Sequence, residues 1–248
     1  MMAGAPPDEA NAPVRLAAMA AASTTIDVLD HGFVRLDAAL ADDLSVVNAA
    51  RVSFGARVDR MDDRNAGLVR FLMRERHGTP FEHNLFRFHI KAPLFVTREW
   101  QRHRVGSFNE RSGRYSELPD EFYVPAAADV RTQVGKPGAY TFEPVPDDIA
   151  EQVRDGIAAS YAESYQRYQE LLADNVAKEV ARTVLPVGLY TEFYWSLNAR
   201  SLMNFLSLRS AEAAQREIRR YAEACEQLFS THMPVTYAAF VANERRAP

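Results

Sequence analysis

The residues best suited to chemistry form one dense segment, from Arg102 to Tyr115. Within fourteen residues it holds four arginines, one histidine, two serines, an asparagine and two glycines. Planar guanidinium groups match the geometry of phosphate and carboxylate oxygens, and glycine lets backbone N–H groups approach an anion closely. The segment therefore predicts a pocket for a small molecule that carries phosphate. An arginine-rich surface loop exposed to solvent is the alternative, which the spacing alone leaves open.

A second group of polar residues follows downstream: Arg182, Asn198, Arg200, Asn204 and Arg209. In a helix that begins near residue 199, Arg200 and Asn204 are four residues apart and share one face. Arg209 would lie at the end of that helix, where the helix dipole favours a cation. The charge of Arg209 is therefore consistent with either helix stabilisation or ligand binding.

Residues 102–114 resemble the signature of the flavin-dependent thymidylate synthases, R-H-R-x-x-S-x-N-E-x-S-x-R, at each of its eight specified positions. Tyr115 follows, as is common in that family. Further segments resemble the family and occur in the family order: His77–His83, Glu121–Tyr123, Arg182–Pro186 and Asn198–Phe205. The resemblance extends over roughly residues 26–242 and leaves out only the N-terminal tail.

This resemblance implies an FAD-dependent methyltransferase of nucleotide biosynthesis that converts dUMP to dTMP. Methylenetetrahydrofolate would donate the carbon, NADPH would reduce the FAD that supplies hydride, and tetrahydrofolate would leave. The resemblance also implies a cytoplasmic homotetramer whose active sites are shared between subunits, with no membrane or nucleic-acid partner. The sequence contains no G-x-G-x-x-G motif and no P-loop, so arginines and loops would have to hold the FAD.

Carried over by position, the resemblance assigns two sets of site residues and no metal ligand. The expected FAD-binding residues are His77, Thr79, Arg102, His103, Arg104, Glu110, Asn198, Ala199, Arg200 and Asn204. The expected dUMP-binding residues are Glu99, Trp100, Gln101, Arg102, Glu110, Arg111, Ser112, Gly113, Arg114, Arg182 and Arg209.

Arg209 is the predicted catalytic residue, because it resembles the residue that contacts the uracil and favours ionisation at N3. A guanidinium keeps its charge and can stabilise a developing uracil anion without losing a proton. Ser112 is expected to bind dUMP and not to attack it, since a serine hydroxyl needs a base within hydrogen-bond reach. The nearest candidate bases, Glu110 and His103, do not make a recognisable triad.

Two positions depart from the family pattern. Glu99 stands where glutamine is common, and a carboxylate there would repel a nucleotide phosphate unless Arg98 or Arg102 compensates. Ala213 and Ala214 follow Arg209 in a segment where some relatives place a histidine near the flavin. The other flavin-binding residues would then have to hold the FAD without that histidine.

The elements that position these residues are predicted from apolar periodicity and turn residues. Period-two alternation predicts a strand over 81–91 with Phe86, Phe88 and Ile90 on one face. A helix over 62–77 is expected to turn Leu68, Phe71 and Leu72 inward. The other predicted helices cover 42–53, 93–104, 148–173, 177–184, 199–208, 211–231 and a segment after Pro234, the other strands cover 26–29, 33–36 and 189–197, and loops cover 102–115 and 129–147.

No repeat or linker divides the chain, so we expect one α+β domain over 26–248 with a small antiparallel-rich sheet, in the fold specific to the family. Residues 1–25 are rich in alanine and proline and are expected to form a disordered extension. The three tyrosines of the 148–173 helix, Tyr161, Tyr165 and Tyr168, are expected in the core or at a subunit interface.

Composition excludes several classes of protein. The chain has 248 residues, with 29 Lys+Arg against 33 Asp+Glu and a net charge of −4, which argues against a general nucleic-acid coat. The single cysteine, Cys225, cannot form an intramolecular disulfide or a cysteine-based metal cluster, and it fits a reducing cytosol. We expect it to be a buried structural thiol in a helix.

Two other functions stay open from the sequence. The arginine segment could serve an RNA- or nucleotide-binding module without catalysis, which would bind polynucleotides with steep salt dependence. A degenerate family member could bind FAD but lose dUMP because of Glu99.

Overall fold

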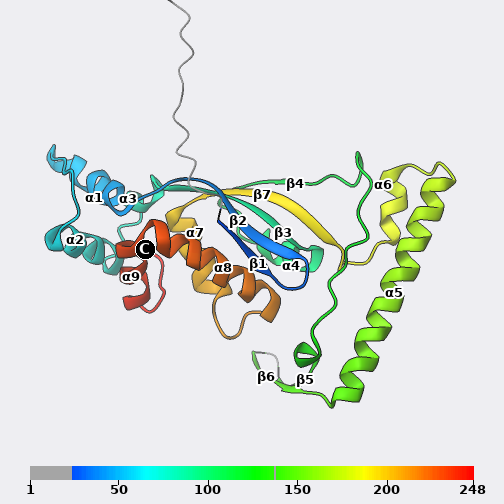
Figure 1. The fold of residues 1–248 in the computed structure, drawn as a ribbon. Helices are drawn as coiled ribbons and strands as arrows, with labels where there is room; N and C mark the ends of the chain where they lie inside the picture. Colours follow the sequence, from blue (N-terminus) through cyan, green and yellow to red (C-terminus); the bar gives the residue numbers. More distant parts are fainter. Residues whose placement is uncertain (1–23, 137) are drawn as a thin grey trace, which may run out of the picture.

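A five-stranded antiparallel sheet organises the computed structural model, which describes residues 24–136 and 138–248 (Figure 1). The strands lie in the order β1-β2-β3-β7-β4. Their bounds are β1 Thr25–Val28, β2 Gly32–Leu40, β3 Leu85–Pro93, β4 Ser107–Glu110 and β7 Tyr190–Asn198. The central pair, β3 and β7, is in register from Leu85 opposite Asn198 to Pro93 opposite Tyr190.

Helices pack against one face and the ends of this sheet and confirm the predicted α+β class. Their bounds are α1 Asp43–Arg51, α2 Asp63–Arg74, α3 Thr79–Glu82, α4 Leu94–Trp100, α5 Asp147–Ala173, α6 Lys178–Ala181, α7 Ala199–Arg209, α8 Arg216–His232 and α9 Pro234–Ala242. Short 3-10 turns cover Val52–Phe54, Ala127–Asp129 and Arg182–Val184. No helix among residues 24–136 and 138–248 is long and apolar enough to cross a membrane.

The main core lies between one face of the sheet and the helices α7 and α8 (Figure 1). The predicted alternation in β3 is confirmed, since Phe86, Phe88 and Ile90 are buried while Leu85 is exposed. The ring of Phe86 packs against that of Phe229 on α8, with 5.9 Å between the ring centroids. The opposite face of the sheet carries polar residues, so this alternation decides which side the helices cover.

Side-chain caps explain where several helices begin. The carboxylate of Asp42 accepts from the backbone N–H of Ser45 at 2.6 Å and starts α1. The amide oxygen of Asn198 accepts from the N–H of Ser201 at 2.9 Å and starts α7. Asn198, which the resemblance assigns to FAD binding, therefore also caps the helix that carries Arg200 and Asn204.

Two predicted loops contain strands. Residues 102–115 include β4, whose backbone pairs with β7. Residues 129–147 include a hairpin, formed by β5 (Arg131–Lys136) and β6 (Ala139–Pro144). Two of the glycines that suggested a loop, Gly135 in β5 and Gly138 just before β6, shape this hairpin. Their φ angles of 108° and 86° are ones that glycine adopts easily.

Three predicted boundaries are wrong for local reasons. The helix predicted over 93–104 ends at Trp100, whose indole is fully buried and anchors the end of α4 in the core. The strand predicted from residue 81 begins at Leu85, because residues 79–82 form α3. The helix predicted from residue 211 begins at Arg216. Residues 1–23 of the predicted extension lie outside the described residues, and Thr25 already belongs to β1.

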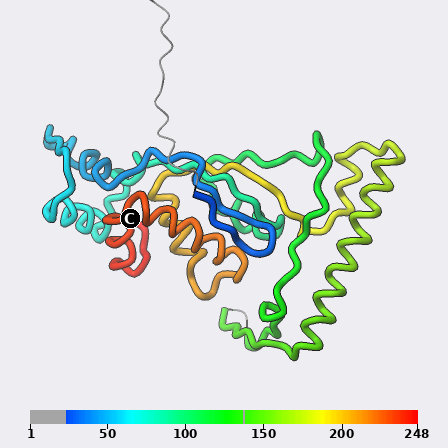
Figure 2. Tube along the Cα trace, in the orientation of Figure 1, coloured from blue at the N-terminus to red at the C-terminus, as the bar shows by residue number. Residues whose placement is uncertain are grey.

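α5 lies at one side of the molecule, after the chain has run from β4 down to the β5–β6 hairpin (Figure 2). A small second core holds it to the sheet, with Tyr168 buried against Leu118, Phe122 and Leu189. The rings of Tyr161 and Phe122 stack with 4.8 Å between the centroids. The core position expected for the tyrosines is thus confirmed, most fully for Tyr168.

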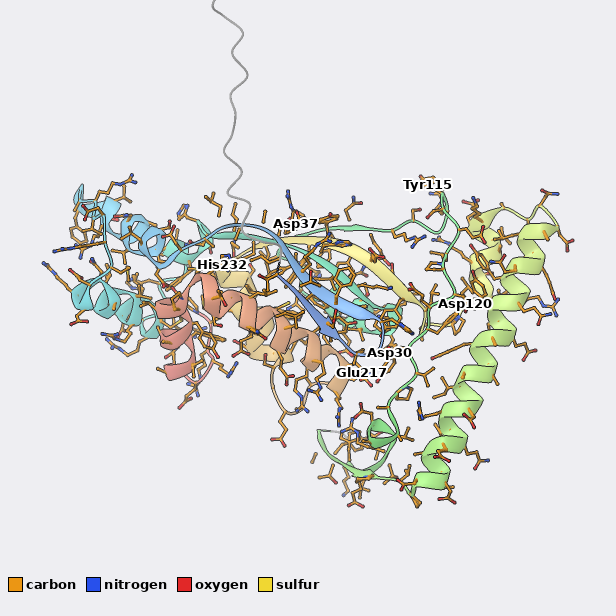
Figure 3. The ribbon with its side chains drawn as sticks, in the orientation of Figure 1. Asp30, Asp37, Tyr115, Asp120, Glu217 and His232 are labelled. Carbon is orange, nitrogen blue, oxygen red and sulfur yellow. The ribbon has the colours of Figure 1, made fainter. Side chains whose placement is uncertain are left out.

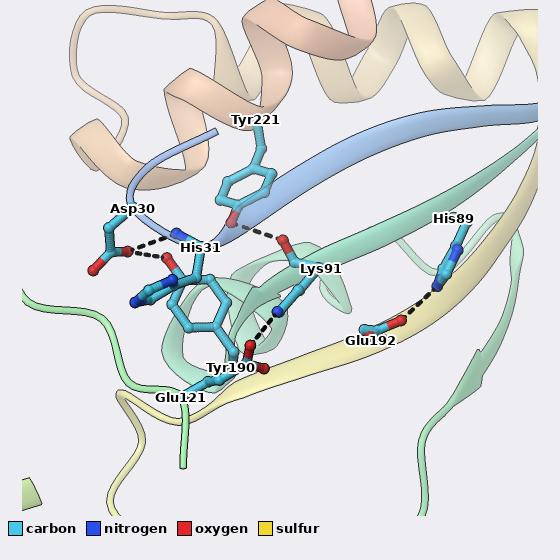
Figure 4. Close-up of polar contacts among 8 residues, drawn as sticks. All are labelled: Asp30, His31, His89, Lys91, Glu121, Tyr190, Glu192 and Tyr221. Carbon is cyan, nitrogen blue, oxygen red and sulfur yellow. Dashed lines mark hydrogen bonds and ion pairs between the residues drawn. The ribbon is translucent and has the colours of Figure 1, made fainter. Parts of the chain in front are cut away.

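Polar contacts fix the β1–β2 turn and the segment that follows the arginine-rich residues (Figure 4). The Tyr190 hydroxyl donates to Asp30 at 2.5 Å, and Lys91 forms an ion pair with Glu121 at 2.8 Å. His89 Nε2 lies 2.9 Å from the carboxylate of Glu192 across β3 and β7. These groups act structurally, because each joins neighbouring segments of the sheet.

Candidate functional site

A cleft of about 720 Å³ opens beside α7, and we call it the α7 cleft. Its lining residues are Arg76, Glu82, Arg102, His103, Arg104, Val105, Trp195, Asn198, Arg200, Ser201, Asn204, Leu208, Arg209, Ala247 and Pro248. Most of the residues expected to bind FAD are therefore brought together, although two segments far apart in the sequence supply them. The C-terminal Ala247 and Pro248 also line this cleft and carry no motif by which the sequence could have indicated them.

The buried faces of α4 and α7 explain why these side chains reach the cleft. Trp100, at the end of α4, stacks on Phe205 of α7 with 4.9 Å between the ring centroids. Leu202 and Leu206 of α7 are also fully buried. The opposite face of α7 therefore points outward and presents Arg200 and Asn204 four residues apart, as predicted.

Trp100 and Ala199 are both fully buried, although the resemblance assigns them to ligand binding. The indole of Trp100 lies among aromatic side chains of β7, α7 and α8. Their side chains therefore pack in the core beneath the site, and only their backbone atoms could contact a ligand.

Arg209 is held from three directions at the edge of the α7 cleft. Its Nε donates to His103 Nε2 at 3.0 Å. Its Nη1 donates to Glu99 Oε2 at 2.9 Å, and its Nη2 donates to the backbone oxygen of Glu99 at 3.2 Å. Arg209 therefore supplies a charge that compensates Glu99, in addition to the two arginines considered from the sequence, Arg98 and Arg102.

Burial controls the protonation of both partners of Arg209. Burial and the nearby guanidinium of Arg209 lower the pKa of His103 to about 4, so the imidazole is neutral at pH 7 and can accept from Arg209. Burial raises the pKa of Glu99 above its ordinary value, while the charge of Arg209 opposes this shift and Glu217 adds to it. The resulting cluster is a charged guanidinium beside one neutral and one acidic acceptor.

A second cavity of about 1160 Å³ adjoins the α7 cleft through Arg76 and Arg200, which line both. His77 and Thr79, the remaining expected FAD residues apart from Glu110 and the buried Ala199, lie here. Phe71 also lines this cavity and is 43% exposed, so the prediction that it points into the core is wrong. Its ring meets that of His77 edge to face, with 5.7 Å between the centroids.

Phe54 and Arg64 line the same cavity and were not predicted as site residues. Phe54 is 87% exposed. The sequence offers only a phenylalanine before Gly55, a pattern that does not by itself indicate a site.

The residues present fit an extended dinucleotide cofactor such as FAD. Five arginines line the α7 cleft and can receive a diphosphate, and the neighbouring cavity has the apolar and aromatic lining suited to a ring system. The fully buried Trp195 lines the cleft, and its indole N–H has no hydrogen-bond partner in the part of the chain that the structure describes. Gly78 allows Arg200 to lie between the two spaces, because a Cβ there would be 2.5 Å from Arg200 Nε.

The other expected dUMP-binding residues lie apart from the α7 cleft. We call Arg111, Ser112, Gly113, Arg114 and Arg182 the arginine-loop cluster. A Cβ on the buried Gly113 would be 3.2 Å from Arg182 Cδ, so the loop packs directly on Arg182. Arg114 forms an ion pair with Glu179 of α6 at 3.0 Å. Figure 3 places the adjoining Tyr115 beside α6, at the opposite end of the molecule from the C-terminus, whose last residues line the cleft.

Glu110 and Gln101 lie between these two groups. Glu110 Oε1 accepts from the hydroxyl of Thr191 at 2.8 Å, and its Oε2 accepts from Gln101 Nε2 at 3.3 Å. The hydroxyl of Ser112 accepts from the backbone N–H of Arg114 at 3.3 Å, and no base lies against it in the hydrogen bonds of the described residues. Among residues 24–136 and 138–248, no three His, Cys, Asp or Glu side chains form a group able to hold a metal ion.

Comparison with known proteins adds independent findings. The profile of the thymidylate synthase complementing protein family matches residues 36–235. The chain is 48% identical over 217 residues to the flavin-dependent thymidylate synthase of Thermotoga neapolitana, which covers 87% of this chain and 94% of that protein. The flavin-dependent thymidylate synthase of Streptomyces coelicolor is 46% identical over 228 residues, which covers 87% of this chain and 93% of that protein.

A solved structure is also similar. The UMP/dUMP methylase PolB from Streptomyces cacaoi, crystallised with 5-Br dUMP, superposes with a TM-score of 0.83 and is 42% identical. The match covers 90% of this chain and all of that chain.

Proposed function

The chain belongs to the family of thymidylate synthase complementing proteins, the flavin-dependent thymidylate synthases, and on this premise we propose that it converts dUMP to dTMP by reductive methylation in the cytoplasm. Methylenetetrahydrofolate donates the carbon and leaves as tetrahydrofolate, and NADPH is the reductant. The observation that carries the proposal is the convergence of Arg102, Arg104, Arg200 and Arg209 on one cleft. When bound, FAD supplies the hydride.

The residues of the α7 cleft have distinct proposed tasks. Arg102, Arg104 and Arg200 bind phosphate oxygens, and Asn204 on the same face of α7 orients the cofactor by hydrogen bonds. Arg209 contacts the uracil ring and stabilises negative charge that develops there on ionisation at N3. The neutral imidazole of His103 accepts a hydrogen bond from Nε of Arg209 and so keeps the guanidinium in place. Together these residues bind, orient and polarise the pyrimidine.

The reaction needs no protein nucleophile in this proposal. Cys225 lies fully buried in α8, where burial raises the pKa of its thiol far above neutral pH. Ser112 has no base hydrogen-bonded to its hydroxyl among the described residues and serves as a nucleotide-binding group. Activation of the uracil is therefore assigned to Arg209 and the bound cofactor.

We propose that each active site combines two subunits of a homotetramer. One subunit supplies the α7 cleft with Glu99, Arg102 and Arg209, and another supplies the arginine-loop cluster to the nucleotide phosphate. The supporting observation is that these two groups, both expected to bind dUMP, lie apart in one chain, the cleft along α7 and the cluster beside α6 (Figure 1). Exposed guanidinium groups in the arginine-loop cluster are then available to a neighbouring subunit.

The purified protein tests the proposal directly. It is expected to show the absorption of an oxidised flavin and to form dTMP from dUMP only with NADPH and methylenetetrahydrofolate, with UMP assayed in parallel. Arg209→Ala should lower turnover by about 100-fold while flavin stays bound. Arg200→Ala or Asn204→Ala should instead weaken flavin retention.

Two outcomes would contradict the proposal. A colourless protein that stays inactive after FAD is added would exclude the flavin enzyme, and binding of polynucleotides without binding of dUMP would favour the nucleic-acid module. If Arg209→Ala lost flavin and Arg200→Ala retained it, the tasks of the two arginines would have to be exchanged.

A further inference from the structure

The hydrogen bonds of Arg209 leave only part of its guanidinium for a ligand. A guanidinium has five N–H donors. Three of them are used by the contacts to His103 and to the side chain and backbone of Glu99. One N–H on Nη1 and one on Nη2 remain for a ligand. Glu99, near the end of α4, thus accepts two hydrogen bonds from the guanidinium and determines its orientation.

Glu99 also determines the net charge at this point of the α7 cleft. The side chains of Arg209 and Glu99 are only 20% and 27% exposed, so solvent screens their charges incompletely. Of the groups that act on the pair directly, His103 is neutral at pH 7 and Glu217 on α8 is acidic. The further positive charge of the cleft comes from Arg76, Arg102, Arg104 and Arg200, and it is the same whichever residue stands at position 99. A negative charge that develops on a bound uracil would therefore be attracted by Arg209 and repelled by Glu99.

We propose that Glu99 is a positioning residue that orients Arg209 and offsets its charge, and so sets how strongly this enzyme favours ionisation of uracil N3. The inference rests on the proposed function of Arg209. Glutamine at position 99 would keep an acceptor for Nη1 and remove the negative charge. The glutamate in this chain therefore fixes the orientation of Arg209 but reduces its electrostatic attraction for a negative charge on the uracil.

The test uses 5-bromo-dUMP bound to the FAD-loaded protein without NADPH. Bromine at C5 makes N3 more acidic, and the ultraviolet spectrum of the ring reports its ionisation. In Glu99→Gln the bound ligand should ionise at a pH lower by about one unit than in the parent, an increase of about tenfold in the ionisation constant. The dissociation constant of dUMP should fall as well, because a repulsive charge is lost.

Two further variants separate charge from mere structural support. Glu99→Asp keeps the charge, so its ionisation midpoint should stay within a few tenths of a pH unit of the parent even if binding weakens. Glu121→Gln removes a carboxylate from a similarly half-buried ion pair with Lys91 outside the cleft, and should leave the midpoint unchanged.

The outcomes distinguish this inference from the proposed function. An unchanged midpoint in Glu99→Gln, or an equal shift in Glu99→Asp or Glu121→Gln, would overturn the role of Glu99 while leaving the proposed function standing. If neither the parent nor any variant bound dUMP or 5-bromo-dUMP, the proposed function itself would fail.

Discussion

Arg209 differs from other arginines of the α7 cleft because each of its three nitrogens already has an acceptor. A guanidinium held in this way loses little freedom when a ligand binds, which is the condition for electrostatic preorganisation. Arg200 is also anchored, by Glu82 at 2.6 Å and by the backbone oxygen of Pro248 at 2.8 Å. At the scale of single residues, the site is thus built from charged groups that the protein orients before any ligand arrives.

Cys225 allows a prediction about what the chemistry does not use. Cys225→Ala should leave dTMP formation essentially unchanged and lower the free energy of unfolding by about 1 kcal/mol, because a fully buried sulfur is removed from the core. Urea denaturation and a turnover assay on the same preparation measure the two effects. In the native parent protein, a thiol reagent should not label Cys225. If Cys225→Ala lost turnover while its free energy of unfolding stayed normal, the thiol would take part in the reaction.

At the scale of elements, Leu118 joins α5 to the arginine-loop cluster. The backbone N–H of Leu118 donates to the hydroxyl of the buried Tyr168 at 3.1 Å, and its carbonyl accepts from the hydroxyl of Tyr165 at 3.2 Å. Leu118 also packs against Gly113, whose missing Cβ allows this close approach. The position of the loop therefore depends on α5.

Removing one of these hydroxyls should show that dependence. Tyr168→Phe leaves the buried N–H of Leu118 without an acceptor and should cost about 1–3 kcal/mol of unfolding free energy. It should also raise the KM for dUMP and speed hydrogen exchange at Leu118 while flavin stays bound. Tyr165→Phe is the matched control, with a smaller expected cost because Tyr165 is less buried than Tyr168. If Tyr168→Phe had an unchanged KM for dUMP and unchanged hydrogen exchange at Leu118, the position of the loop would not depend on α5.

At the scale of the whole molecule, the homotetramer proposal accounts for the separation of the expected dUMP-binding residues. The α7 cleft lies along α7 and the arginine-loop cluster lies beside α6, two elements that are well apart in Figure 1. In that view no helix of the described residues lies over the face of the sheet away from α7 and α8. Exposed apolar residues also occur on the β5–β6 hairpin and at the start of α5, including Phe142 and Ile149. These features are consistent with assembly, which the homotetramer proposal requires.

Mixing of inactive subunits tests the shared site. Arg209→Ala and Arg182→Ala proteins, each inactive, should regain activity when unfolded and refolded together, to about a quarter of the parent value if subunits mix at random. The reason is that one site in four then combines an intact cleft with an intact loop. Light scattering should show a tetramer in every sample.

The control combines two defects of the same group. Arg209→Ala mixed with Arg200→Ala should regain nothing, because both residues line the α7 cleft of one chain. Recovery in this control, or none in the first mixture despite hybrid tetramers, would contradict the shared site.

The amino-acid sequence by itself determined much of the fold and the chemical character of the site. Period-two alternation identified β3 and β7, and helical spacing identified α5 and α7, because burial of one face leaves a direct trace in residue order. It missed β4 and the β5–β6 hairpin, whose strands are stabilised by backbone pairing and hold mostly polar or exposed residues. The spacing of arginines from 102 to 114 indicated an anion-binding site without indicating which of them would meet.

Only the tertiary structure decided how those residues are distributed. It placed Arg102 and Arg104 beside Arg200 and Arg209, and carried Arg111 and Arg114 to the other end of β4 beside α6. It also paired Glu99 with Arg209, residues that are 110 positions apart. The physical reason is that contacts between distant segments depend on how α4 and α7 pack through Trp100 and Phe205, and local residue patterns carry no record of that packing.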